Sequence, residues 1–556
     1  MSFDHRKYRP FPALSRPQRR WPDRVITSAP LWCAVDLRDG NQALARPMNL
    51  AQKQRLFDLL VKLGFKEIEI GFPAASQPDF DFCRQLIEQE RIPADVTVQV
   101  LTQARPELIA RSFEALKGAR RAVMHVYNST STVQREQVFQ TDRAGVKAMA
   151  VRGAELVRQH AALQPDTEWV FQYSPESFTG TEVDFAVEVI DAVTAVWRPE
   201  AGQGVILNLP ATVEMATPNV FADQIEYVCD HIRQREHVII SVHTHNDRGC
   251  AVAAAELAVM AGADRVEGTL LGNGERTGNM DLVTMAMNLY SQGIDPLLDL
   301  SHMKEIVATV EACTDIQTHP RHPYAGDLVF TAFSGSHQDA IRKCLQLRQE
   351  EQPWQVAYLP IDPADVGRRY EEVVRINSQS GKGGVAHVLE RDYGITLPRW
   401  LQVELSQVVQ RATESSGGEI DSHSIHRLFR EHFLDVPAGW GLGHYSLNRG
   451  DSGVAARIGL AGGEALEGHG QGAVEALADA LARRFQLAIE VEAYEEFAVA
   501  AGTGAEAMAC LRVKVNGASA SAVAMAPDTS AAVLQALLSA VGRQGAAAPA
   551  PEACLA

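Results

Sequence analysis

Residues 238–271 read VIISVHTHNDRGCAVAAAELAVMAGADRVEGTLL, and this stretch contains one complete strand–helix–strand unit. The short apolar run at 238–245 is typical of a strand, and the alanine-rich stretch at 250–263 is typical of a helix. Gly262 is a residue type that commonly ends helices, and it stands just before a second apolar run at 265–271. The stretch therefore predicts two strands connected by a helix.

The same rhythm extends back through the chain to residue 31. Six further apolar runs, separated by longer amphipathic stretches, lie at 31–37, 66–72, 96–102, 121–127, 169–174 and 204–210. Eight strand-then-helix units in about 270 residues have the length and rhythm of a (β/α)8 TIM barrel, an α/β fold. A doubly wound open sheet is the alternative. No GxGxxG follows the first strand, however, and eight regular units favour closure.

The remaining sequence predicts additional parts around the barrel. We assign residues 1–30 to an N-terminal arm, 31–302 to a catalytic TIM barrel and 303–436 to helical linker subdomains. Residues 437–545 are assigned to a C-terminal α+β domain, and residues 546–556 to a disordered tail. The arm is basic and lacks the apolar segment of a signal peptide. Its interspersed prolines and Trp21 favour a segment that packs on another part of the protein, and a transit peptide is the alternative. In the C-terminal domain, short strands followed by an Ala/Leu-rich helix occur twice, which predicts a βββα repeat.

The composition argues against several functional classes. The 556 residues carry a formal net charge of −17, whereas nucleic-acid binding needs a basic face. No apolar run approaches the roughly 20 residues that cross a bilayer. The eight cysteines form no CxxC pair, and a chain of this size does not need disulfides. We therefore expect a cytoplasmic protein that acts on small molecules and binds neither nucleic acid nor membranes.

Polar residues stand at or beyond the carboxyl end of nearly every predicted strand, where a TIM barrel carries its active site. They include Arg38, Asp39, Thr102, His125, Glu176, Thr212, His243, His245 and Asn273. His243 and His245 point to one side of their strand and suit a divalent metal. Asp39 can reach the same centre, because one strand separates the first strand from the seventh in a closed barrel. Without that placement, core or surface histidines and a surface Arg–Asp pair would be the simpler interpretations.

A glycine-rich loop, GNGERTGN at 272–279, follows the eighth predicted strand. Such loops can hold phosphate through backbone N–H groups, but this one lacks the lysine of a P-loop. Two interpretations stay open for it. It is either a tight turn or a loop whose Asn279 amide oxygen completes the metal shell.

Five segments together resemble a known superfamily. They are DLRDGNQAL, YSPESFTGTE, LPATVEMATPN, VHTHNDRGCAVAAAELA and GNGERTGN, at 36–44, 173–182, 209–219, 242–258 and 272–279. The chain from about residue 7 to residue 435 resembles the pyruvate-carboxylase/HMG-CoA-lyase-like barrels and, among them, the long-arm branch of the 2-isopropylmalate synthase family. The resemblance implies a divalent metal held by Asp39, His243, His245 and Asn279. Mg²⁺ is the first choice, Mn²⁺ and Zn²⁺ are the alternatives, and K⁺ is a candidate activator.

The resemblance also implies a reaction and the residues that perform it. The reaction is the Claisen condensation of acetyl-CoA with 2-oxoisovalerate and water, which gives 2-isopropylmalate and CoA and commits carbon to leucine. The implied substrate-binding residues are Arg38, His125 and Thr212, and the implied catalytic residues are Arg38, Glu176, His337 and Tyr370. In such enzymes His337 and Tyr370 commonly come from the partner subunit's helical segment. Homocitrate and citramalate synthases, which share the barrel motifs, are the alternative assignment.

The C-terminal domain resembles the family's leucine-binding regulatory domain, which implies leucine as an effector and a homodimer. Its loop GHGQGAVEAL at 468–477 contains Gly468, Gly470 and Gly472, which permit close backbone approach. The family's usual loop is GxGNGPxDAL, so Asn, Pro and Asp are here replaced by Gln471, Ala473 and Glu475. Leucine sensitivity therefore stays open, and a dimerisation module without a ligand is the alternative.

Two functions from other classes compete with the synthase assignment. Metal-dependent amidohydrolases also use an HxH pair, but typically on the first strand, whereas here the pair falls on the seventh. A non-catalytic amino-acid sensor would need only the C-terminal module, and the intact barrel motifs argue against it.

Overall fold

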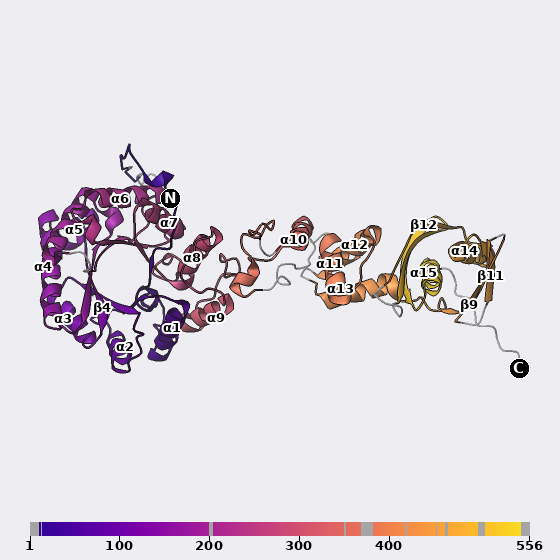
Figure 1. Ribbon diagram of the computed structural model, residues 1–556, viewed down its shortest axis with the longest axis horizontal. Helices are drawn as coiled ribbons and strands as arrows, with labels where there is room; N and C mark the ends of the chain where they lie inside the picture. Colours follow the sequence, from indigo (N-terminus) through magenta and orange to yellow (C-terminus); the bar gives the residue numbers. More distant parts are fainter. Residues whose placement is uncertain are drawn as a thin grey trace, which may run out of the picture. The chain divides into compact units, whose positions relative to one another are not determined.

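The computed structural model describes residues 11–12, 14–199, 204–349, 352–368, 382–416, 420–451, 453–461, 465–498 and 506–545. Two compact units are distinguished: Met1–Val329 with Ile361–Arg368, and Phe330–Pro360 with Arg369–Ala556 (Figure 1). The expected catalytic residue Tyr370 and the expected tail at 546–556 lie outside the described residues. Among the described residues, no helix combines the length and the apolar character needed to cross a membrane.

The first unit contains a closed barrel of eight parallel strands, so the predicted TIM barrel is confirmed. The strands, in chain order from β1 to β8, are Leu31–Ala34, Glu67–Gly71, Thr97–Gln103, Arg121–Ser129, Glu168–Glu176, Val205–Ala211, Ile239–Thr244 and Arg265–Gly268. Closure is made by β1 and β8, which pair in register from Leu31 opposite Arg265 to Ala34 opposite Gly268. The strand order follows the chain order around the whole ring.

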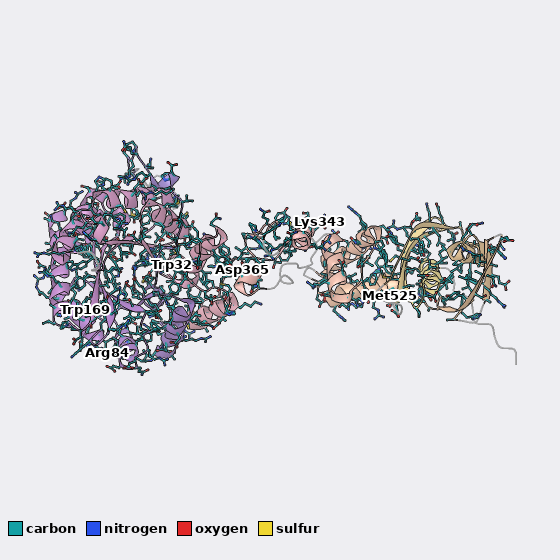
Figure 2. The ribbon with its side chains drawn as sticks, in the orientation of Figure 1. Trp32, Arg84, Trp169, Lys343, Asp365 and Met525 are labelled. Carbon is teal, nitrogen blue, oxygen red and sulfur yellow. The ribbon has the colours of Figure 1, made fainter. Side chains whose placement is uncertain are left out.

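Helices surround these strands as an outer ring (Figure 1). The helices from α1 to α9 are Leu50–Leu63, Gln77–Glu88, Pro106–Ala115, Arg143–Ala162, Val183–Trp197, Pro218–His231, Ala251–Ala261, Leu282–Ser291 and Met303–Thr314. Asn49 and Gln52 cap the start of α1 reciprocally, and Gly262 ends α7 at a φ of 118°, as its sequence position predicts. Trp169 of β5, which is labelled in Figure 2, packs against Phe113 of α3 with ring centroids 4.7 Å apart.

The described part of the N-terminal arm packs on α6. Arg19 forms an ion pair of 2.6 Å with Asp223, and Arg16 forms one of 3.1 Å with Glu226. The buried Trp21 donates its indole N–H to Asp223 at 2.9 Å. These contacts use the basic character of the arm to attach it to an acidic helix face, which accounts for charges that the sequence alone left without a role.

The second unit combines helices with two small antiparallel sheets. Its helices α10 to α13 are Gly335–Leu347, Lys382–Tyr393, Arg399–Ser416 and Ser422–Phe429. Three strands and a helix follow: β9 (Leu442–Gly450), β10 (Gly453–Leu460), β11 (Ala465–Gly470) and α14 (Ala473–Phe485). The same order then repeats in β12 (Ile489–Ala498), β13 (Ala507–Val515), β14 (Ala518–Ala526) and α15 (Thr529–Arg543). Their sheet orders are β11-β10-β9 and β12-β13-β14, so the predicted α+β domain with a βββα repeat is confirmed.

Two of the three loop glycines let β11 pack directly against α14. A Cβ atom on Gly468 would collide with the carbonyl oxygen of Ala476 and would lie 2.7 Å from the backbone nitrogen of Ala480. A Cβ atom on Gly470 would lie 2.6 Å from the backbone nitrogen of Ala476, whereas one on Gly472 would meet nothing within 4 Å. Helix packing within this domain therefore accounts for Gly468 and Gly470.

Gly468→Ala is expected to destabilise the C-terminal domain by about 1–3 kcal/mol, because the added methyl group overpacks the strand–helix contact. The measurement is thermal unfolding of the full chain by calorimetry. Gly472→Ala is the matched control, and its unfolding profile should stay close to that of the native chain. Equal shifts for both variants would contradict the packing argument.

Candidate metal centre and active site

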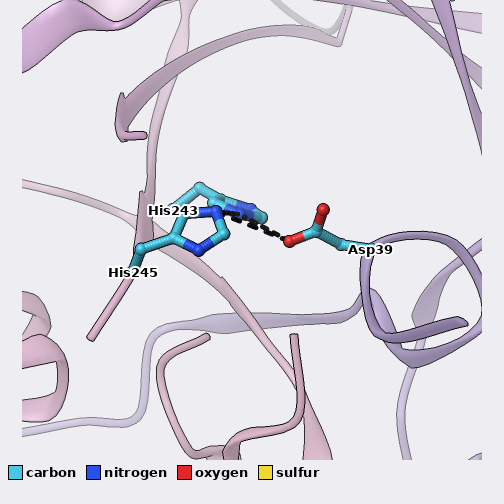
Figure 3. A group of neighbouring side chains, drawn as sticks. All are labelled: Asp39, His243 and His245. Atoms are coloured by element: carbon cyan, nitrogen blue, oxygen red, sulfur yellow. Dashed lines mark hydrogen bonds and ion pairs between the residues drawn. The ribbon is translucent and has the colours of Figure 1, made fainter. Parts of the chain in front are cut away.

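Asp39, His243 and His245 converge at the carboxyl ends of β1 and β7 (Figure 3). Asp39 belongs to a short π-helical turn, Asp36–Gly40, that follows β1. Its Oδ2 atom lies 3.4 Å from Nε2 of His243 and 3.6 Å from Nε2 of His245, and the two Nε2 atoms lie 3.3 Å apart. All three side chains are buried. Among the described residues, this is the group of His, Cys, Asp and Glu side chains whose ligand atoms could share one ion.

The surrounding charges give the two imidazoles different proton affinities. Burial lowers the pKa of His243, but the nearby carboxylates of Asp39 and Glu267 outweigh burial and raise the pKa to about 9. Burial lowers the pKa of His245, and the neighbouring His243 lowers it further, to about 4. The Nε2 atom of His243 that faces Asp39 is therefore either protonated or, when a metal is bound, a metal ligand.

The donor set fits a divalent metal. Two imidazole nitrogens and a carboxylate oxygen are ligands that such ions commonly take. Asp39 Oδ2 and Asn279 Oδ1 are buried oxygen atoms with no hydrogen-bond partner among the described residues. Asn279 forms an isolated β-bridge with His245, and its amide nitrogen donates to the carbonyl of Asn273 at 3.0 Å, which leaves Oδ1 for another partner.

The buried charges around this centre also favour a cation. Three carboxylates and two guanidinium groups are enclosed there: Asp39, Glu69, Glu267, Arg38 and Arg265. With both imidazoles neutral, these five groups carry one net negative charge, and Glu67, which pairs with Arg265, adds another. A divalent cation at the Asp39–His243–His245 group would offset this negative charge in the low dielectric of the barrel interior.

Arg38 connects the centre to the next strand. Its Nη1 donates to Asp39 Oδ1 at 2.7 Å, and its Nε donates to Glu69 on β2. Burial opposes the charge of Arg38, but Glu69 and Asp39 outweigh it and raise the pKa of the guanidinium. The pKa of Asp39 falls well below its usual range, because Arg38 outweighs the effect of burial. Both groups therefore stay charged at neutral pH.

The barrel mouth holds a cavity of about 660 Å³. Arg38, His125, Glu176 and Thr212, all predicted from the sequence, line it together with the metal group. His125 lies between Glu69, 3.1 Å from Nδ1, and Ser174, 2.7 Å from Nε2. The hydroxyl of Thr212 accepts the backbone N–H of Ser177 at 2.9 Å, and Glu176 accepts a hydrogen bond from Ser129.

Two expected catalytic residues do not belong to the described part of the unit that contains this cavity. His337 lies on α10 in the second unit, where its exposed ring stacks on Tyr358 with centroids 3.9 Å apart. Tyr370 is not among the described residues. Gly468, Gly470 and Gly472 also belong to the second unit. The cavity is therefore built from the barrel alone.

Residues that the sequence analysis did not single out complete the barrel interior. Glu69 and Glu267 are fully buried carboxylates on β2 and β8, and Arg265 is a fully buried guanidinium on β8. Burial raises the pKa of Glu267, but Arg265 outweighs it, so the pKa lies well below the usual range. The available signal was a charged residue inside an otherwise apolar strand, as in KEIEIGF and RVEGTLL.

Asp36, at the start of the π-helical turn, titrates unusually. Burial raises its pKa to about 8, against the hydrogen bond that its Oδ1 accepts from the backbone N–H of Leu270. The carboxyl is therefore mostly neutral at pH 7 in the folded protein, while an unfolded chain ionises it near pH 4. This difference opposes folding, and it grows as the pH rises from about 4 to about 8.

Asp36→Asn is therefore expected to stabilise the barrel by about 1–3 kcal/mol near pH 8 and by little near pH 4, because asparagine keeps the acceptor and does not titrate. Calorimetric unfolding of both proteins at pH 4 and pH 8 measures the difference. A gain that is independent of pH would contradict the raised pKa.

Comparison with known proteins adds independent information. Residues 29–310 match the HMGL-like family, residues 327–390 match the alpha-isopropylmalate synthase post-catalytic domain-like family, and residues 419–544 match the LeuA allosteric (dimerisation) domain. A 2-isopropylmalate synthase of Alcanivorax borkumensis is 67% identical over 98% of each chain. Another, from Rhodospirillum rubrum, is 57% identical over 92% of this chain and 93% of its own. A third, from Ralstonia nicotianae, is 54% identical over 97% of this chain and 95% of its own.

Proposed function

This chain belongs to the 2-isopropylmalate synthase family, and from that premise we propose that it condenses acetyl-CoA with 2-oxoisovalerate at the barrel mouth. The observation that carries the proposal is the buried Asp39–His243–His245 group beside Arg38 in a cavity of about 660 Å³. The reaction joins the acetyl methyl carbon to the keto carbon of the 2-oxo acid, and hydrolysis of the thioester then releases CoA.

Binding of the 2-oxo acid is assigned to the cationic side of the cavity. Arg38 uses Nε and Nη1 for Glu69 and Asp39, so its Nη2 group serves the oxygens of the substrate. Thr212 accepts a backbone N–H, so its own hydroxyl proton is donated to the substrate carboxylate. His125, held by Glu69 and Ser174, forms the side of the pocket, and Glu176 limits its depth.

Asp39, His243, His245 and Asn279 are assigned as metal ligands, with Mg²⁺ first and Mn²⁺ or Zn²⁺ as alternatives. When bound, such an ion supplies positive charge to the keto group and to the alkoxide that replaces it. Arg38 adds a second positive group, because its ion pairs hold it beside Asp39. The same ion pairs keep the guanidinium in place while negative charge develops on the substrate, so no reorganisation is needed during the reaction.

The proton of the acetyl methyl group needs a base. We assign this role to His337, assisted by Tyr370, because a neutral imidazole nitrogen can accept a proton. We further propose that a second copy of the chain supplies both residues, that the working form is a homodimer, and that leucine regulates it through the C-terminal domain. The match of residues 419–544 to an allosteric dimerisation domain supports this regulation. K⁺ activation and a cytoplasmic location complete the proposal, and the free state of the seven described cysteines supports the location.

The test measures CoA release by the purified full-length chain with 2-oxoisovalerate, pyruvate and 2-oxoglutarate, each with and without a chelator and leucine. We expect preference for 2-oxoisovalerate, loss of activity with the chelator, and recovery on adding Mg²⁺ or Mn²⁺. Preference for pyruvate or 2-oxoglutarate would instead assign a citramalate or homocitrate synthase. Activity that persists after complete metal removal would contradict the metal-dependent reaction.

A further inference from the structure

Glu267 is the most densely bonded carboxylate described in the barrel interior, and the mechanism above gives it no role. Its Oε2 atom lies 2.9 Å from Nδ1 of His243 and 3.3 Å from the amide nitrogen of Asn208. Its Oε1 atom accepts from Arg265 and from Gln172, both at 2.7 Å. The side chain is fully enclosed, so water cannot replace these partners.

The contact with His243 determines which nitrogen of that ring faces the metal centre. An ionised carboxylate can only accept hydrogen bonds, so Nδ1 of His243 must carry a proton. In a neutral imidazole the lone pair then lies on Nε2, the atom that faces Asp39 at 3.4 Å. We infer that Glu267 is a positioning residue that locks His243 in the orientation and tautomer that bind the metal.

Arg265 explains why Glu267 can perform this role while buried. Its guanidinium is fully buried and bonds Glu267, Glu67, Ser241 and Gln99 at distances of 2.6–2.9 Å. Such a charged pair stays ionised only when its hydrogen bonds are satisfied, and here Arg265 has partners on both sides. Arg265 and Gln172 thus fix the Oε1 atom of Glu267 through two hydrogen bonds, and this orients its Oε2 atom toward His243.

Glu67 provides a matched control, because it binds the same guanidinium from the opposite side. Its Oε2 accepts from Nε of Arg265 at 2.6 Å, compared with 2.7 Å for Glu267 and Nη1. Both carboxylates therefore stabilise Arg265. Of the two, Glu267 is the one that contacts His243. A purely structural role through Arg265 would make the two positions equivalent.

This inference rests on the proposed function, so the experiment measures metal binding directly, without turnover. The metal-free full-length chain and its Glu267→Gln and Glu67→Gln variants are titrated with Co²⁺ and with Zn²⁺ against a chromophoric chelator. An amide at position 267 can donate to Nδ1 and so place the ring proton on Nε2, where it blocks the metal. We expect the Kd of Glu267→Gln to rise about 10–100-fold and its Co²⁺ absorption spectrum to change.

Glu67→Gln is expected to keep the native Kd and spectrum. Glu267→Asp keeps the charge but shortens the side chain, so it should weaken binding less than Glu267→Gln does, and it also serves if the amide variant fails to fold. Saturating metal should restore most of the activity of either variant at position 267. A native metal Kd in both variants at position 267, or equal losses of metal affinity in Glu67→Gln and Glu267→Gln, would overturn this inference and leave the proposed function standing. If the Asp39→Ala variant binds Co²⁺ with the same Kd as the native chain, the proposed metal site itself would be overturned.

Discussion

Replacing His243 and His245 together by alanine is expected to lower the rate of CoA release by at least about 10³-fold. The physical reason is that the two nitrogens assigned to the metal are lost, and with them the positive charge proposed to stabilise the developing alkoxide. A loss of this size corresponds to about 4 kcal/mol at the transition state, which is within the range for a single strong electrostatic contribution. The measurement is initial rate at saturating substrate, together with the metal content of the purified variant.

The matched control for this double variant changes two histidines away from the cavity. His231 stacks on Tyr227 at the end of α6, and His237 follows in the next short turn. The double variant His231→Ala, His237→Ala should keep its rate within about twofold, as surface substitutions usually have small effects. Full turnover by the His243→Ala, His245→Ala variant would remove the basis of the proposed reaction.

Arg38→Lys is expected to lower kcat/KM for 2-oxoisovalerate by about 10²- to 10³-fold, although the charge is retained. Arg38 contacts Asp39 and Glu69 at the same time through its planar guanidinium, and a lysine ammonium cannot reproduce this fork. The change therefore leaves the charge of one buried carboxylate poorly neutralised, and it removes one hydrogen-bond donor that is assigned to the substrate. Steady-state kinetics with varied 2-oxoisovalerate measure the effect.

Arg46→Lys is the corresponding control. Arg46 also pairs with an aspartate, Asp315, but both side chains are more than three-quarters exposed to solvent, so the pair contributes little. Its kcat/KM should remain within about twofold of the native value. Equal kinetics for Arg38→Lys and the native chain would show that only the charge at position 38 matters, and would contradict the role given to the fork.

Much of the fold was predictable, because the patterns that determine it are local. Strand 7 and its helix could be located from an apolar run, an alanine-rich stretch and the stop at Gly262, and the structure confirms that stop. The repetition of this unit favours closure, since eight strand–helix units are the number from which a TIM barrel is built. The family resemblance drawn from the barrel motifs is confirmed by the relatives that match nearly the whole chain.

The candidate site was predictable in part for the same reason. Barrel strands present their carboxyl ends at one rim, so residues as distant in sequence as Asp39 and His243 could be expected to meet, and the structure brings them together. His337 is different, because its location on α10 says nothing of which cavity it serves. Its role stays a prediction from the resemblance, as does that of Tyr370.

By itself, the sequence determined the number and order of the strand–helix units and the polar residues at their rim. Only the tertiary structure decided which buried charges meet below that rim: Arg38 with Glu69, and His243 with Glu267, which Arg265 holds. The reason is that alternation along a strand says which side chains point inward, while their partners depend on the stagger between strands far apart in the chain. The positions of the charges around the candidate metal site are therefore set by that stagger.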